Sequence, residues 1–438
     1  MERSKSRGES LRIGGYVNED RINELPDDLL LKILSLLATK DVITMSVLAK
    51  RWRYLWMMVP NLKFIYNPEN GLERFSDNVR RCLLTYQAPV LQSLHLDITL
   101  ISEPLDISLI SEPSMDIEIL METMFGLHVR ELVFEAYSIE PFKLPISLYN
   151  WETLETLKLG SSILVDVPSP VFMKSLRTLH LTHVDFKGDE SVLNLLCGCF
   201  CLQNLVVDRI GCDNVDTFTI SVPSLQRLTI IVNDFYLPYV ISAPSLKYLK
   251  IEGGLLLRSR LIENAPDLVH ALNNILASFD SFKLLALKIP PSEITFPTGS
   301  IFNQLVCLEL CTYRVGWCNL LTAMLDSSPN LRVLKLIGLV SPCLSQQKQD
   351  FEDFVWTQPK NVPECLLLHL ETFVWRFYKG RLEDEKEVAK YILRNASCLK
   401  KAVFSKLSII PEERVEIVKE LERVVRASNT SNLNIIIN

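Results

Sequence analysis

The chain has 438 residues, of which 48% are hydrophobic and 22% charged, a composition typical of a globular protein that can bury a large core. Its formal net charge of −6 gives no overall indication of nucleic-acid binding. The polar N-terminal segment lacks the apolar stretch of a secretory signal peptide, and the longest uncharged run, residues 191–207, is too short for a membrane-spanning helix. Eleven cysteines without a framework spacing predict reduced thiols, and hence a protein of the cytoplasm, the nucleus or both.

A polar tail, residues 1–18, is predicted to be disordered and precedes a helical module over residues 19–65. Pro26 suits the first position of the first helix, because its missing N–H costs nothing there. Leucine and isoleucine then occupy nearly every side of this helix, and a helix that is apolar all round must be buried. So short a segment cannot cover the helix alone, and we therefore predict a docking module that a partner protein completes.

Two further helices are predicted in the module. Thr39 is expected to cap the N-terminus of a second helix over residues 40–48. Trp52, Leu55 and Trp56 share one face of a third helix, and the basic residues beside them face elsewhere.

From residue 91 onward, the pattern apolar-x-x-apolar-x-apolar occurs twelve times, and eight of the eleven distances between successive copies are 21–29 residues. This is the period of a leucine-rich repeat, in which each copy contributes one short strand. One copy cannot bury its own apolar face, whereas stacked copies can, so residues 80–345 are predicted to form a curved solenoid with a parallel inner sheet. The copies begin at Leu91, Val129, Leu154, Leu176, Leu202, Leu225, Leu246, Leu284, Leu305, Leu331, Leu370 and Leu399.

The central outward position of each strand would face the inner side of the solenoid. Lysine and histidine are common at this position, so we expect it to favour an acidic or phosphorylated ligand, although solvated strand positions explain the same pattern. The candidate contacts to a bound target are His95, Lys158, His180, Lys250, Lys288, Glu309 and Lys335.

Residues 360–438 read as a terminal α/β cap. Strands are predicted at residues 370–378 and 400–405 and near 433–437, and helices at residues 383–395 and 411–426. Both helices are rich in charged residues, and a polar outer face suits the end of a repeat array.

Three segments together resemble a known family. The sequences LPDDL at residues 25–29 and KRWRYLW at residues 50–56 resemble an F-box of the plant type, and residues 363–405 resemble the FBD domain. With the irregular leucine-rich repeats between them, the chain is similar to the plant F-box/FBD/LRR-repeat proteins. The fold implied is α/β: a three-helix F-box, a leucine-rich-repeat solenoid with a parallel inner sheet, and an α/β C-terminal cap.

The resemblance implies a substrate-recognition subunit of an SCF-type cullin–RING ubiquitin ligase. The F-box would bind a Skp-family adaptor, and through it the cullin and RING subunits, while the repeats and the FBD domain would bind an unknown target. Alanine replaces the usual proline at Ala38 and the usual serine at Ala49, and neither change removes an apolar contact. The family's adaptor contacts fall on Leu25, Pro26, Leu29, Ile33, Leu36, Val42, Val47, Lys50 and Trp52, with Trp56 in support.

Other functions are compatible with parts of the sequence. A non-ligase interaction scaffold would use the repeats alone. A DNA-associated regulator would use the basic segment at residues 50–53, although a DNA-binding module rarely exposes so much apolar surface.

Cys197, Cys199 and Cys201 lack the CxxC spacing of a zinc site, and His180 and His183 point to opposite faces of a strand. No phosphate loop, nucleophile elbow or HExxH motif occurs, so we expect a non-catalytic protein without cofactor or metal.

Overall fold

The computed structural model describes most of the chain between residues 25 and 437. The predicted tail and Ala49 lie outside the described residues. Of the predicted helix over residues 411–426, only four residues are described. The described ranges are 25–47, 50–67, 71–99, 117–138, 140–209, 215–232, 239–253, 283–288, 301–312, 317–338, 358–378, 383–405 and 433–437, with residues 22, 356, 419, 421, 423 and 424.

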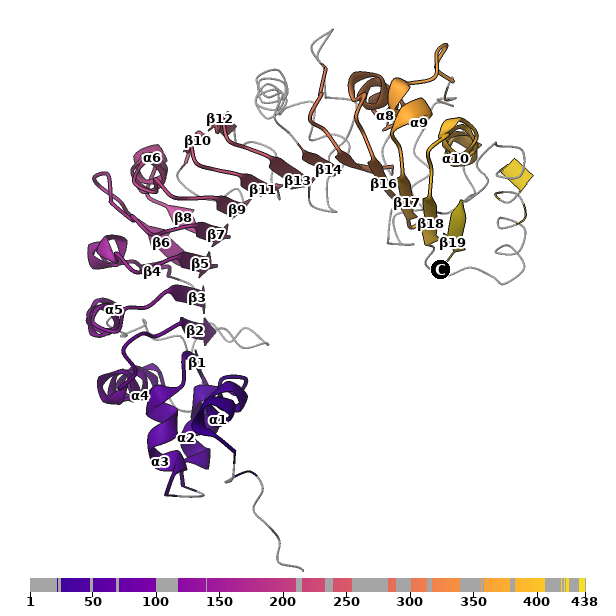
Figure 1. The fold of residues 1–438 in the computed structure, drawn as a ribbon. Coiled ribbons are helices and arrows are strands. Elements are labelled where there is room, and N and C mark those ends of the chain that lie inside the picture. Colours follow the sequence, from indigo (N-terminus) through magenta and orange to yellow (C-terminus); the bar gives the residue numbers. More distant parts are fainter. Residues whose placement is uncertain are drawn as a thin grey trace, which may run out of the picture.

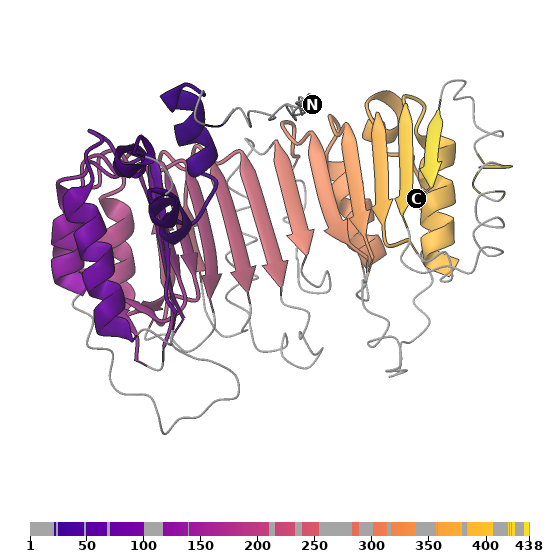
Figure 2. The ribbon, with the colours of Figure 1, turned by 90° about the horizontal axis from the view of Figure 1, so that it is seen from below.

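Fourteen parallel strands form one curved sheet, and their order in the sheet follows their order in the chain. Figure 1 shows the sheet on the inner side of an arc, and Figure 2 shows the strands side by side and pointing in one direction. The strands are β1 (Asn61–Ile65), β2 (Ser93–Thr99), β3 (Glu131–Tyr137), β5 (Thr156–Gly160), β7 (Thr178–Thr182), β9 (Asn204–Arg209), β11 (Arg227–Val232), β13 (Tyr248–Gly253), β14 (Leu284–Lys288), β15 (Cys307–Cys311), β16 (Val333–Ile337), β17 (Thr372–Arg376), β18 (Lys401–Ser405) and β19 (Asn434–Ile437).

The return segments between the strands lie on the outer side of the arc (Figure 1). The helices there are α4 (Leu72–Thr85), α5 (Ile117–Phe125), α6 (Asp189–Cys197), α8 (Trp317–Ser327), α9 (Glu364–Leu368) and α10 (Glu383–Asn395). Shorter returns are the 3-10 helix η4 (Ile146–Asn150), the strands β4 (Phe142–Lys143), β6 (Ile163–Val165) and β8 (Asp185–Phe186) of one small sheet, and β10 (Phe218–Ser221) and β12 (Tyr239–Ser242) of another.

The repeat pattern identifies the core side of each strand. In β3, Leu132 and Phe134 are fully buried, whereas Val133 between them is only partly buried. All twelve copies of the pattern correspond to strands of the main sheet. The predicted parallel inner sheet is therefore confirmed, and with it the mixed α/β fold class.

The predicted frame of one copy is wrong. The pattern predicts that this copy begins at Leu284, with Lys288 at the central outward position. The structure instead pairs Lys250 of β13 with Ala286, and Lys288 with Glu252 at the strand end. The sequence fits both frames because Phe282, Leu285 and Leu287 match the pattern as well. Ala286 therefore takes the central position, and the Lys288 side chain lies outside the described residues.

The first strand of the sheet was not predicted. Strand β1 lies in the segment assigned to the helical module, and it pairs with β2 over five residues. Val59, Leu62 and Phe64 match the repeat pattern and are all buried, so the pattern holds one copy more than the twelve counted.

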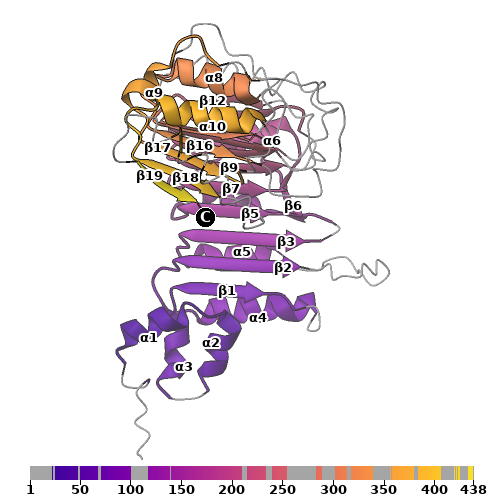
Figure 3. The ribbon, with the colours of Figure 1, turned by 90° about the vertical axis from the view of Figure 1, so that its right-hand side faces the viewer.

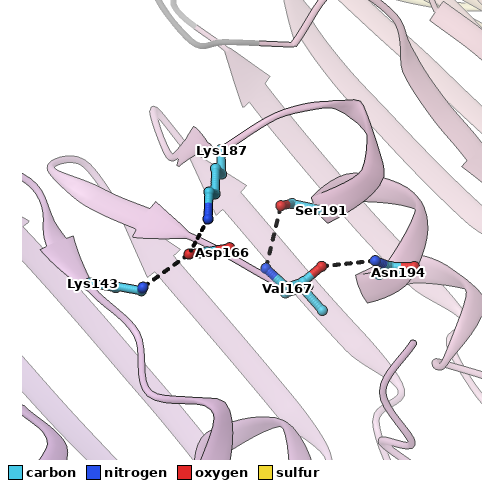
Figure 4. Close-up of polar contacts among 6 residues, drawn as sticks. All are labelled: Lys143, Asp166, Val167, Lys187, Ser191 and Asn194. Atoms are coloured by element: carbon cyan, nitrogen blue, oxygen red, sulfur yellow. Dashed lines mark hydrogen bonds and ion pairs between the residues drawn. The ribbon is translucent and has the colours of Figure 1, made fainter. Parts of the chain in front are cut away.

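Polar contacts join consecutive returns on the outer side. The Asp166 carboxylate follows β6 and lies 3.0 Å from the Lys143 ammonium of β4 and 3.1 Å from the Lys187 ammonium after β8 (Figure 4). The carboxylate is nearly buried, while both lysines are exposed. Hydrogen bonds from the two lysines lower the pKa of Asp166.

The adjacent residue Val167 continues this network. Its N–H donates to the Ser191 hydroxyl at 3.3 Å, and its carbonyl accepts from the Asn194 amide at 2.9 Å (Figure 4). Ser191 and Asn194 both belong to α6, so these two bonds fix the helix against the return that precedes it.

The predicted elements of the C-terminal segment are largely present. Strands β17, β18 and β19 extend the main sheet, and α10 covers the residues expected to be helical. Trp375 of β17 is fully buried and packs edge-on against Trp317 of α8, with ring centroids 5.7 Å apart. The cap therefore shares one core with the repeats.

Candidate functional site

Three short helices lie beyond β1 at the N-terminal end of the sheet (Figure 3). They are α1 (Asp27–Leu34), α2 (Thr39–Met45) and α3 (Trp52–Leu55), and α3 continues into the 3-10 helix η1 (Trp56–Met58). They share a small core of their own. Its buried members are Leu30, Leu34, Val42, Leu55 and Val59, and Leu25, Leu31, Leu37, Met45, Trp52 and Trp56 pack around them.

Local polar contacts hold the helices in place. Arg51 donates from Nε to the Asp27 carboxylate at 2.8 Å, which ties the start of α3 to the start of α1. Asp27 and Asp28 lie in the first turn of α1, where the helix dipole favours negative charge.

Thr39 does not cap its helix as predicted. The N-cap of α2 is Ala38, without a side-chain hydrogen bond, and Thr39 is the first helical residue. Its hydroxyl instead accepts a hydrogen bond from the Lys63 N–H of β1 at 2.7 Å. The hydroxyl is used to join the helices to the sheet.

Only part of α1 is covered by the module itself. Leu29 and Ile33 are 45% and 46% exposed, and their spacing places them on one side of α1. Leu36, in the turn directly after α1, is 85% exposed. We call these three residues the docking stripe. Pro26, Val47 and Lys50 are also exposed. The structure therefore leaves six of the ten predicted adaptor contacts open to solvent.

The other four predicted contacts are covered by the module. Val42 is only 4% exposed and belongs to the core, together with Leu30 and Leu34 of α1. Leu25, Trp52 and Trp56 are partly buried against the same core. The sequence did not single out Tyr54, which is exposed on α3 beside the buried Leu55, because the two tryptophans dominate the apolar pattern there.

The module is joined firmly to the repeats. The Tyr86 hydroxyl donates to the Val59 carbonyl at 3.1 Å, and the Gln87 N–H donates to the Met57 carbonyl at 3.0 Å. Val59 lies in the core of the module, whereas Leu62, three residues on, lies in the core of the solenoid. Strand β1 thus belongs structurally to both parts.

The inner face of the sheet carries paired charges. The Lys158 ammonium lies 2.7 Å from the Glu131 carboxylate, and the Lys250 ammonium lies 2.7 Å from Glu252. Lys335 lies 3.8 Å from Glu309. Burial, and next the charge of Lys158, lower the pKa of His180, which favours its neutral form. The row is therefore far less basic than its lysines and histidines suggest.

The histidines and cysteines considered in the sequence lie in different surroundings. His180 lies on the inner face of β7, while the His183 imidazole lies 3.3 Å from the Asp208 carboxylate. Cys199 is buried, which raises the pKa of its thiol to about 12, while Cys197 and Cys201 are exposed. Every cysteine in the described part of the chain is a free thiol.

No helix of the described residues has the length and apolar character to cross a bilayer.

Comparisons with known proteins cover all three regions. Residues 22–64 match the F-box domain, residues 358–404 match FBD, and residues 119–272 match the family described as FBD-associated F-box protein At5g56370, LRR repeats. The chain is 53% identical to F-box/FBD/LRR-repeat protein At3g26920 of Arabidopsis thaliana, over 99% of both chains. It is 46% identical to F-box/FBD/LRR-repeat protein At3g52680 of the same organism, over 97% of this chain and 95% of the relative.

Proposed function

Because the chain belongs to the F-box/FBD/LRR-repeat proteins, we propose that it is the substrate-recognition subunit of an SCF-type cullin–RING ubiquitin ligase. Its N-terminal helices dock a Skp-family adaptor, and the adaptor brings the cullin and RING subunits. The inner face of the solenoid and the FBD strands bind the target protein. The chain itself contributes no chemistry in this function, and it works in the cytoplasm or the nucleus.

The observation that carries this proposal is the docking stripe. Leu29 and Ile33 are exposed aliphatic side chains on a helix whose other side, Leu30 and Leu34, is buried, and exposed Leu36 follows in the turn after the helix. Burying one such side chain stabilises a complex by about 1.5–3 kcal/mol. An apolar helix side of this kind suits a groove on a partner protein, and Lys50 is exposed as well and can offer a polar contact.

The junction between the module and the repeats also supports the proposal. A ligase receptor holds its target at a set distance from an enzyme on other subunits, which raises the effective concentration of the target lysine. The hydrogen bond from Lys63 to Thr39 and the shared strand β1 oppose hinge motion at this junction. A target on the inner face would keep one position relative to the adaptor.

The paired charges on the inner face change the expected target chemistry. Lys158 and Lys250 each already have a carboxylate at 2.7 Å, so an acidic or phosphorylated ligand would have to compete with Glu131 and Glu252. We therefore propose that recognition of the target uses these pairs together with aliphatic positions of the FBD strands. Val374 of β17, Val403 of β18 and Ile436 of β19 are register partners in one row of this face.

The test is capture of a purified Skp-family adaptor by the full chain. Leu29→Asp and Leu36→Asp place a charge in the docking stripe and should abolish capture without unfolding the solenoid. Leu84→Asp is the matched control, because Leu84 is a leucine on α4, outside the module, whose exposure lies between those of Leu29 and Leu36. Capture that survives both stripe substitutions would exclude this docking surface. A wild-type chain that captures no adaptor would favour an interaction scaffold that is not part of a ligase.

A further inference from the structure

The inner face of the sheet holds a compact group of metal-ligating side chains near its N-terminal end. His95 and Asp97 lie two residues apart on β2, and therefore on the same face of the sheet. Glu135 of β3 is the register partner of Asp97. One donor atom from each of the three side chains lies within 4.8 Å of the other two.

This arrangement is unfavourable without a cation. Asp97 and Glu135 are like-charged residues directly opposite each other on neighbouring strands, which destabilises a sheet. Within the described residues, neither carboxylate forms an ion pair with a lysine or an arginine, in contrast to the neighbouring Glu131, which has Lys158 at 2.7 Å. Asp97 accepts a hydrogen bond from the Thr99 hydroxyl at 3.1 Å, a neutral group that does not balance its charge.

The imidazole of His95 supplies an independent observation. Its Nε2 atom is shielded from solvent and has no hydrogen-bond partner within the described structure. It lies 3.5 Å from Glu135 Oε2, within the range of an ion pair but beyond a good hydrogen bond. A buried polar atom without a partner is rare in folded proteins and needs an explanation. A metal ion between imidazole and carboxylates would satisfy Nε2 and neutralise both acids.

The neighbouring strands leave room for such an ion. Gly160 of β5 is the register partner of Glu135, and a Cβ atom at Gly160 would lie only 3.2 Å from Glu135 Cγ. The glycine therefore keeps open the space in which the Glu135 side chain lies. On the other side, Lys63 of β1 is the register partner of His95. It is exposed, so its long side chain can keep the ammonium in solvent.

We propose that His95, Asp97 and Glu135 bind a divalent transition-metal ion, and that Zn²⁺ matches the site best. One imidazole nitrogen and two carboxylate oxygens are donors that Zn²⁺ accepts, with bonds of about 2.0–2.2 Å. Calcium and magnesium prefer a shell made of oxygen alone. Three protein ligands leave a coordination position open toward the inner side of the arc, where water would complete the shell.

The experiment is a titration of the full chain with Co²⁺, followed by absorption, and with Zn²⁺, followed by calorimetry. Cobalt distinguishes the ligands, because a thiolate ligand gives an intense near-ultraviolet charge-transfer band that a nitrogen and oxygen shell does not. This matters because Cys197, Cys201 and Cys398 are exposed thiols. We expect one saturable site without the thiolate band, and a rise in Tm on adding Zn²⁺.

Two substitutions and one control make the test specific. His95→Gln and Glu135→Gln should each weaken binding by about tenfold or more, the scale at which even outer-shell changes act, and should remove the Zn²⁺-induced rise in Tm. His183→Gln is the control, since it removes a histidine beside a different carboxylate, Asp208, and should leave binding unchanged.

The proposal would be overturned by a chain without saturable binding, by a cobalt complex with the thiolate band, or by equal affinity for Zn²⁺ in wild type and His95→Gln. Binding of Mg²⁺ or Ca²⁺ as tight as that of Zn²⁺ would also overturn it, because the histidine would then not be a ligand. The docking stripe lies on α1 and the turn after it, away from β2 and β3, so adaptor capture by these variants reports on the proposed ligase role separately.

Discussion

The backbone N–H of Lys63 donates a hydrogen bond to the side-chain hydroxyl of Thr39 at 2.7 Å. This bond joins the first residue of α2 to the middle of the first strand of the sheet. Thr39 is itself buried, so water cannot replace the hydroxyl. The bond is therefore a buried polar contact of the junction between the docking module and the solenoid, in addition to the hydrogen bonds of Tyr86 and Gln87.

Replacing this hydroxyl should loosen the junction. Thr39→Val keeps the shape of the side chain but leaves the Lys63 N–H without an acceptor, which costs about 1–3 kcal/mol for a buried group. Hydrogen exchange at the Lys63 amide should become faster, and the free energy of unfolding should fall by that amount. Thr39→Ser retains the hydroxyl and should protect the Lys63 amide nearly as well as threonine does. Equal exchange in both variants would show that the bond does not hold the junction.

Some elements of this fold can be predicted from local sequence patterns, and others depend on contacts between distant segments. Inward pairs such as Leu132 and Phe134 predict their strand because burial of alternate residues is a local property. The frame of β14 is not local, because Leu284 and Leu285 both fit the pattern and only pairing with β13 selects between them. Strand β1 was missed because its residues directly follow the helices of the module. A strand this short is identified mainly by the strands on either side of it in the sequence.

The candidate sites divide in the same way. The surplus of leucine in α1 predicts that part of the helix is exposed to a partner, and Leu29, Ile33 and Leu36 agree with that expectation. Val42 lies in the core of the module, and apolar spacing alone cannot tell which side of α2 is buried there. The ion pair of Lys158 with Glu131 spans 27 positions in sequence and exists only because β3 and β5 are adjacent. Contacts between stacked repeats cannot be predicted from the sequence of a single repeat.

The backbone of Val171 approaches Gly198 closely on the outer side of the arc, so replacing this glycine should destabilise the fold. Gly198 is the C-cap of α6, and a Cβ atom there would lie 1.7 Å from the Val171 carbonyl oxygen. One of the two backbone segments would have to shift to relieve this clash. Gly198→Ala should lower the free energy of unfolding by about 1–3 kcal/mol, the usual cost of overpacking. Gly126→Ala is the control, because a Cβ atom at Gly126 would meet no other atom within 4 Å. Chemical denaturation of both variants measures the difference, and equal midpoints would contradict the clash.

The Asp166 contacts predict a dependence of stability on pH. Lys143 and Lys187 lower the pKa of Asp166 in the folded chain, so the unfolded chain binds the proton more readily. The stabilisation is therefore fully present above the ordinary aspartate pKa of about 3.9, and it disappears as the pH falls through the lower, folded value. Wild type should exceed Asp166→Asn in stability at pH 7, and this margin should shrink in acid.

Urea denaturation of both proteins across this pH range measures the margin. Glu152→Gln provides the matched control, because Glu152 has a lowered pKa from the same cause, a lysine, here Lys174 at 2.9 Å. Both partners of that pair are well exposed, and exposed pairs contribute little to stability. A margin for Asp166 that is as small as that for Glu152, or that grows in acid, would contradict the argument.

The aromatic contacts of Trp375 predict that the C-terminal cap and the repeats unfold together. Its ring packs against Trp317 of α8 and against Tyr378, with centroids 5.7 Å and 4.9 Å away. Trp375→Ala should cost about 3–5 kcal/mol, as for other buried aromatic residues. Trp375→Phe keeps an aromatic ring and removes an indole N–H that has no acceptor in the described structure, so its cost should be smaller. Calorimetry should show a single transition that moves to lower temperature in both variants. If the cap instead melted alone in Trp375→Ala while the repeats kept their original Tm, the shared core would not couple the two parts.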